Sequence, residues 1–150
     1  MKRDPALVSL SRDHHQALAV ALRLRRATAA TATDARADAL RFWATAGRAH
    51  FRLEEEVLLP AYARHGDPHH PLVARALCDH VAIRARMDAL ALAPSVPPEI
   101  VCLRELGAML SDHVRLEERE LFALVERTLP AADLAALAAA LERAEADGDG

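Results

Sequence analysis

The sequence of 150 residues has few of the features that mark several familiar classes of protein. Its two cysteines, Cys78 and Cys102, are too few for a disulfide framework, and we expect both to be small buried residues. No run of about 18 or more apolar residues occurs, so we expect no membrane-spanning helix and no membrane partner. The N-terminal stretch MKRDPALVSLSRDHH lacks the apolar block of a signal peptide. These absences predict a cytoplasmic protein with reduced thiols.

The sequence also lacks a strong net charge, and few of its residues interrupt helices. Its 19 basic and 22 acidic side chains give a formal net charge of −3, so nothing attracts the whole chain to nucleic acid. Only five glycines and eight prolines interrupt a chain rich in Ala and Leu, which favour helices. Since no segment alternates with a period of two, we expect an all-α fold. The length suits a single domain, residues 1–150, with its core over about residues 9–130.

Helical periodicity divides the chain into four long segments and one short segment. Gaps that contain proline or glycine separate some of them, as in HGDPHHP at 65–71 and APSVPPE at 93–99. The first helix is expected to have Ser11 as its N-cap. The four long helices are predicted to form an antiparallel up-down four-helix bundle, followed by a short C-terminal fifth helix. The expected helices cover about residues 11–30, 34–64, 70–92, 98–128 and 130–144.

Histidines and glutamates occupy regular positions in the apolar seams of these helices. The seam of the second helix advances by three and four residues through Leu40, Trp43, Gly47, His50, Glu54, Val57 and Ala61. The sequence HFRLEE at 50–55 returns as HVRLEE at 113–118, which makes an internal repeat with an offset of 63 residues. A histidine and a glutamate one turn apart are therefore predicted to face the core twice.

These polar residues need a reason to be buried. A single His/Glu pair is usually a surface hydrogen bond, and a single core histidine is usually hydrogen-bonded to its surroundings. Two unpaired buried carboxylates would each cost several kcal/mol, which a domain stable by about 5–15 kcal/mol cannot accommodate. Four histidines and two glutamates at one depth therefore predict bound cations. Imidazole with carboxylate suits iron, manganese or zinc, and we expect a dinuclear centre with two histidines on each metal and both glutamates bridging.

The segments that carry these histidines share the order and spacing of a known family: DHHQAL, HFRLEEEVLLP, HHPLVARALCDHVAI and HVRLEERELF. They resemble the hemerythrin-like family, whose HHE domains bind cations. The resemblance spans about residues 9–130 and implies a four-helix bundle around a non-haem di-iron centre with two iron ions. It implies metal-ligand roles for five residues, which are His50, Glu54, His80, His113 and Glu117.

The ligand on the first helix is predicted to be His15. Leucines follow it at +3 and +7, where apolar residues also follow His80. The alternative is His14, because it belongs to an Asp-His dipeptide like the one at Asp79-His80.

A second alternative concerns the fourth helix. Glu118 lies five residues after His113, and oxygen-carrying hemerythrins use an aspartate at that spacing. The internal repeat with Glu54 favours Glu117 instead. Arg84 stands where those oxygen carriers have a fifth histidine, so a five-histidine centre is not expected.

Fold and metal do not determine the activity within this family. The leading expectation is a di-iron protein that binds or senses dioxygen, nitric oxide or iron. The alternative is a di-iron enzyme acting on nitric oxide or peroxide, or an iron donor in the repair of iron centres. The absence of an obvious redox-partner motif favours binding over catalysis. The expected partner is a small diatomic ligand or peroxide, and the sequence does not identify a protein partner. Manganese or zinc would suit the same donors as iron.

Overall fold

A computed structural model describes residues 2–92 and 97–148, and all regular structure in these two ranges is helical, without strands. The longer helices are α1 (Val8–Arg25), α2 (Ala32–Phe42), α5 (Pro71–Leu92), α6 (Ile100–Leu116) and α8 (Ala131–Gly148). Shorter helices are η1 (Pro5–Leu7), α3 (Arg48–Leu53), α4 (Leu59–Ala63) and α7 (Phe122–Thr128). Three π turns connect α-helical segments, namely η2 (Trp43–Gly47), η3 (Glu54–Leu58) and η4 (Glu117–Leu121). Residues 93–96, part of the predicted gap at 93–99, lie outside the described ranges.

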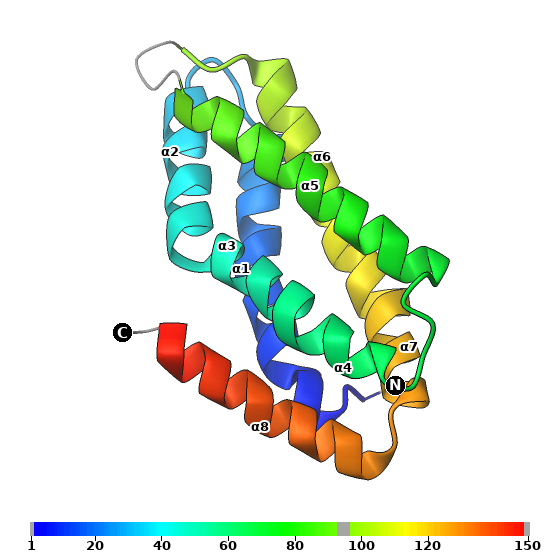
Figure 1. Ribbon diagram of the computed structural model, residues 1–150. Coiled ribbons are helices and arrows are strands. Elements are labelled where there is room, and N and C mark those ends of the chain that lie inside the picture. The colour runs from blue at the N-terminus through cyan, green and yellow to red at the C-terminus, as the bar shows by residue number, and fades with distance from the viewer. Residues whose placement is uncertain (1, 93–96, 149–150) are drawn as a thin grey trace.

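The helices pack in a ring (Figure 1). Helix α1 contacts α2 and α6, and helix α5 contacts the same two helices from the other side. Helix α8 lies outside the ring, across η1, α3 and η3. The prediction of an all-helical bundle with a further C-terminal helix is therefore confirmed. Among the described residues, no helix is both long and apolar enough to cross a membrane.

The first helix begins earlier than the sequence predicted. The Ala6 N–H donates to Asp4 Oδ1 at 2.9 Å, so Asp4 caps η1. Pro5 occupies the first position of this turn, where no backbone N–H is needed. Helix α1 continues directly from η1, and Ser11 therefore lies inside the helix instead of capping it.

Two of the π turns occupy matching places in the internal repeat. In each, a backbone N–H donates to the carbonyl five residues earlier, from Leu59 to Glu54 and from Phe122 to Glu117. A π turn contains one residue more than an α-helical turn, and this additional residue changes which later side chains face inward. The predicted seam is consequently wrong beyond Glu54, because Leu58 is buried where Val57, only partly buried, was expected.

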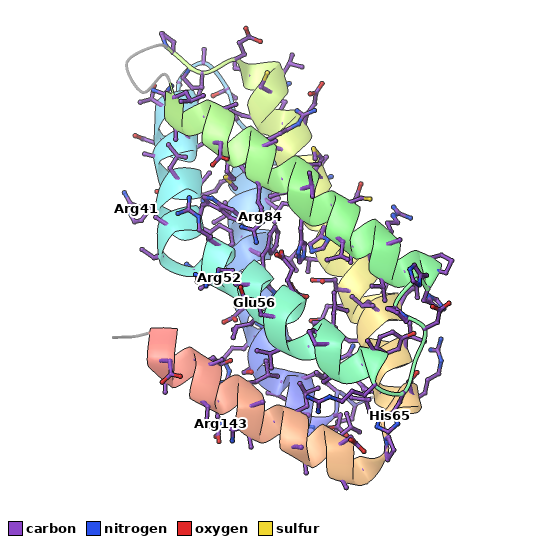
Figure 2. The ribbon with its side chains drawn as sticks, in the orientation of Figure 1. Arg41, Arg52, Glu56, His65, Arg84 and Arg143 are labelled. Carbon is purple, nitrogen blue, oxygen red and sulfur yellow. The ribbon has the colours of Figure 1, made fainter. Side chains whose placement is uncertain are left out.

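Two hydrophobic clusters lie on either side of a buried polar layer. On α1, Leu10 belongs to one cluster and Ala17 to the other, and on α5 the same division separates Ala76 from Ile83. Between these residues come buried histidines. Charged side chains such as Arg41 cover the outside of the molecule (Figure 2). The polar layer is therefore enclosed by apolar packing along the helices.

Helices α1 and α6 approach each other closely at Gly107. A Cβ atom at this position would lie 2.7 Å from the carbonyl oxygen of Ala21, so only glycine fits without a shift. The buried side of α1 carries the small residues Ala17 and Ala21 together with larger apolar residues such as Leu24. Leu18 and Leu22 face outward instead and are 36% and 44% exposed.

Candidate metal centre

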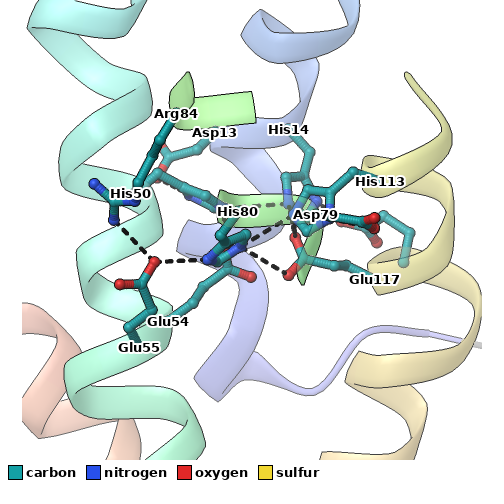
Figure 3. A network of polar contacts seen from close by, with 11 residues as sticks. Asp13, His14, His50, Glu54, Glu55, Asp79, His80, Arg84, His113 and Glu117 are labelled. Atoms are coloured by element: carbon teal, nitrogen blue, oxygen red, sulfur yellow. Dashed lines mark hydrogen bonds and ion pairs between the residues drawn. The ribbon is translucent and has the colours of Figure 1, made fainter. Parts of the chain in front are cut away.

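Five of the six residues predicted as metal ligands lie together in the polar layer (Figure 3). His50 comes from α3, Glu54 from η3, His80 from α5, His113 from α6 and Glu117 from η4. All five are buried, and both glutamates are fully inaccessible to solvent. The structure thus brings residues from three separate stretches of the chain into one cluster.

The prediction that His15 faces the interior is wrong, and His14 takes that place. His14 is 2% exposed, whereas His15 lies on the surface. The prediction assumed that Leu18 and Leu22 mark the buried side of the helix, but α6 packs against another side, which carries alanines and two other leucines. The dipeptide Asp13-His14 was the signal in the sequence that identified the correct histidine.

Two overlapping groups of four buried residues are arranged to hold a cation. In each group, one nitrogen or oxygen atom from every residue lies within 4.8 Å of the atoms from the others. The groups are His14, His50, Glu54 and Glu117, and Glu54, His80, His113 and Glu117. The two glutamates belong to both groups, which is the arrangement that bridging carboxylates require.

The histidines direct their Nε2 atoms toward the centre. His50 Nε2 lies 3.2 Å from His14 Nε2, and His80 Nε2 lies 3.2 Å from His113 Nε2. The carboxylate of Glu117 joins the two pairs, since its Oε1 is 3.1 Å from His14 Nε2 and 3.2 Å from His113 Nε2. Imidazole nitrogens and carboxylate oxygens therefore converge on one small volume.

A carboxylate outside the cluster holds the other ring nitrogen of every histidine. The Nδ1-to-oxygen distances are 2.6 Å for His14 to Glu118, 3.1 Å for His50 to Asp13, 2.7 Å for His80 to Glu55, and 3.1 Å for His113 to Asp79. Because an ionised carboxylate only accepts hydrogen bonds, each Nδ1 donates its hydrogen outward. Metal sites use such pairs to fix the tautomer and the orientation of a ligating imidazole.

Glu118, the alternative to Glu117, therefore has a different position. Its side chain is 30% exposed and contacts the outer nitrogen of His14, whereas Glu117 is fully buried at the centre.

The buried glutamates have unsatisfied oxygens. Three of their four carboxylate oxygens, both oxygens of Glu54 and Oε2 of Glu117, accept no hydrogen bond from the described residues. His50 Nε2 approaches Glu54 Oε1 to 3.0 Å, but without the geometry of a hydrogen bond. Burying carboxylate oxygens without partners is costly, and cations between the two groups would remove that cost. The residues present therefore fit a pair of bound metal ions.

The neighbouring carboxylates favour the protonated form of three of the buried histidines. Burial alone would lower the pKa of His113, but the charge of Glu117 and the hydrogen bonds to Asp79 and Glu117 raise that pKa to about 10. The pKa values of His14 and His50 are also raised, since neighbouring carboxylates outweigh burial. Burial would raise the pKa of Glu117, yet the charge of His113 and several hydrogen bonds hold it well below the usual value.

A small cavity adjoins the cluster beside His14, His50 and His113, with a volume of about 10 Å³. Its other lining is mostly apolar and includes Ala46 and Gly47. A larger open groove of about 610 Å³ lies outside it, between α8 and the ring of helices. Asp13, Ala46 and His50 line both spaces, so these three residues stand between the groove and the cavity.

The two cysteines lie outside the cluster. Cys78 and Cys102 are exposed, which contradicts the prediction that they are buried. The donors gathered at the candidate centre are nitrogen and oxygen atoms only.

A helical bundle that encloses two groups of buried histidines with shared carboxylates is typical of metal-binding helical domains. The family model of the hemerythrin HHE cation binding domain matches residues 6–125. The chain belongs to this family, and helix α8 lies beyond the matched part. No curated protein and no solved structure gives a significant match to the chain.

Proposed function

We propose that the protein is a non-haem di-iron protein that binds or senses dioxygen, nitric oxide or iron. The observation that carries this proposal is the pair of overlapping donor groups that share two buried carboxylates. In the proposal, the helices form the antiparallel up-down four-helix bundle implied by the resemblance, and each long segment contributes one histidine.

The six buried side chains would bind two ions. His14 and His50 would hold one ion, His80 and His113 would hold the other, and both glutamates would bridge. When bound, iron would supply redox chemistry and open positions for a small ligand. The protein's own contribution is to orient four imidazoles and to exclude other donors. Manganese or zinc would suit the same donor set.

The small cavity limits the size of any ligand that approaches the centre through it. A volume of about 10 Å³ is close to the smallest that holds one water molecule, so an organic substrate does not fit there. Three of the histidines line it, and the rest of its wall is mostly apolar. Such a wall favours a small uncharged molecule such as dioxygen or nitric oxide over an ion.

Iron analysis with an optical spectrum tests the proposal. Protein loaded with ferrous iron under anaerobic conditions should contain about two iron ions per chain. Addition of dioxygen or nitric oxide to the reduced protein should produce a new absorption band. A plateau at one iron per chain would contradict the dinuclear assignment. A spectrum that responds to neither gas would favour iron sensing.

The same preparation separates binding from catalysis. Stable adducts in a fixed ratio to the protein are expected for a sensor or carrier. Rapid consumption of nitric oxide or peroxide by the iron-loaded protein would instead identify an enzyme.

A further inference from the structure

Arg84 holds the carboxylate that orients His80 (Figure 3). Its Nη2 donates to Glu55 Oε2 at 2.8 Å, and the same oxygen lies 2.7 Å from His80 Nδ1. A single carboxylate oxygen therefore joins the arginine to the histidine. Charge-assisted bonds of this kind are short and strongly directional, so they fix the position of Glu55.

Arg84 also acts on the face of the same imidazole through Phe51. The Phe51 ring stacks on His80, with the ring centroids 3.8 Å apart and the planes at 5°. The Arg84 guanidinium lies 5.8 Å from the centroid of Phe51, within cation–π range. The imidazole of His80 is thus held at one edge and on one face, and both contacts involve Arg84.

Arg3 occupies the equivalent place beside His14. Its Nη2 lies 3.3 Å from Glu118 Oε2, and it also forms an ion pair with Glu126. Glu118 Oε1 in turn lies 2.6 Å from His14 Nδ1. The Phe122 ring stacks on His14 at 5.3 Å and 13°, and Arg3 lies 5.4 Å from the Phe122 centroid. The same combination of arginine, glutamate, aromatic ring and histidine therefore occurs twice.

The internal repeat produces only part of this likeness, because Glu55 and Glu118 occupy equivalent positions in it. Arg3 precedes η1, whereas Arg84 lies within α5, and the position in the repeat that corresponds to Phe51 is Val114. Unrelated parts of the chain have thus supplied the arginine and the aromatic ring of each set, which indicates a shared role.

The two histidines concerned are those that need outside support. His50 and His113 each lie one turn before a buried glutamate on the same helical segment. His14 and His80 have no such neighbour on their own helices. Among the described residues, Arg84 and Arg3 pair with glutamates and not with the aspartates that hold His50 and His113.

We propose that Arg84 and Arg3 are positioning residues for metal binding, Arg84 for the ion held by His80 and Arg3 for the ion held by His14. The inference rests on the proposed metal centre. Each arginine fixes a glutamate, the glutamate fixes the Nδ1–H direction, and that direction aims Nε2 at the ion.

Arg86 provides a matched control on the same helix. It pairs with Glu105 at 2.8 Å, the same distance as Arg84 to Glu55, but on the surface and without a histidine. Cobalt(II) titration against a competing chelator is the measurement. Arg84→Gln should weaken one of the two bound ions about 10–100-fold and leave the other unchanged. Arg86→Gln should leave both unchanged, and Arg84→Lys, which keeps the charge, should restore part of the lost affinity.

A second background assigns each arginine to its ion. In His14→Ala, the ion of His80 should be the one that remains tightly bound. Adding Arg84→Gln should weaken that ion about 10–100-fold, whereas adding Arg3→Gln should have no further effect. The metal-free melting temperature of each variant measures any purely structural loss. Such a loss would lower the stability of the fold without weakening one ion more than the other.

Three outcomes would overturn the inference. One is that Arg84→Gln binds both ions as tightly as Arg86→Gln. Another is that Arg84→Gln or Arg3→Gln weakens both ions equally, because that result indicates general loosening of the fold. A wild-type protein that binds no cobalt would overturn the proposed function, and this inference with it, whereas the first two results leave the proposed function intact.

Discussion

Three consecutive glutamates, Glu54, Glu55 and Glu56, differ in their distance from the candidate centre and provide a graded test. Glu54 belongs to both donor groups, Glu55 contacts one donor histidine, His80, and Glu56 forms a surface pair with Arg52 (Figure 2). Glutamine has nearly the same shape as glutamate but carries no charge. We therefore expect Glu54→Gln to lose both ions. Glu55→Gln should bind one of the two ions more weakly, and Glu56→Gln should bind both as the wild type does.

The expected magnitudes follow from linkage between metal binding and folding. At a free metal concentration about 100 times the dissociation constant, each ion stabilises the folded protein by about 2.7 kcal/mol, and two ions by about 5 kcal/mol. In a domain of this length, about 1 kcal/mol moves the Tm by about 2–4 °C, so metal should raise the wild-type Tm by about 10–20 °C. Glu54→Gln should lose most of that shift. Glu55→Gln should lose about 1–2 kcal/mol of it, because an outer partner changes affinity about 10–100-fold.

Thermal melts with and without manganese(II), together with metal analysis, measure this series. Each variant is compared with its own metal-free melt, so that changes in the stability of the metal-free fold cancel. Glu56→Gln should match the wild type, since its side chain is 62% exposed. If Glu54→Gln kept two ions and the full shift, the shared-carboxylate reasoning would be refuted. Loss of only one ion would show that Glu54 serves a single group.

Three further predictions test the packing and the electrostatics. His14→Ala should weaken metal binding in a chelator competition, whereas His15→Ala should leave it unchanged and alter stability by no more than about 0.5 kcal/mol; the reverse would make His15 the ligand. Gly107→Ala should lower the free energy of unfolding in urea by about 1–3 kcal/mol, because its Cβ would press on the backbone oxygen of Ala21, and an unchanged value would contradict the close packing. The raised pKa of His113 stabilises the metal-free fold fully below about pH 6.5, and this contribution is lost as the pH rises through about 10. Metal-free Tm should therefore fall from pH 7 to 10 while metal affinity rises, and a Tm that increases over this range would refute the sign.

The local part of this structure was predictable from the sequence. Helical segments follow from apolar spacing within a few turns, and the buried His50 and Glu54 follow from their place in that spacing. The internal repeat then identified His113 and Glu117 as a second pair with the same environment. Burial of these four residues needed no knowledge of which helices are neighbours, because each pair lies on one segment.

The remainder depended on contacts between segments. The choice of His14 over His15 is set by which side of α1 packs against α6, and α1 carries leucines on both sides, with Leu10 and Leu24 on the buried one. The π turns shifted the seams after Glu54 and Glu117, although a run of four-residue steps through Leu121 and Val125 was a signal of the additional residue. The outer carboxylates and Arg3 could not be assigned at all, since their partners lie far away in the sequence.

The arrangement of the outer carboxylates shows that neither half of the chain completes the centre alone. The first half supplies His14, but the carboxylate that orients it is Glu118 from the second half. Likewise, His80 of the second half is oriented by Glu55 of the first. Each donor group also takes one of the two shared glutamates from each half. A cation that binds either group therefore holds both halves together, so the free energy of metal binding also stabilises the association of the two helix pairs.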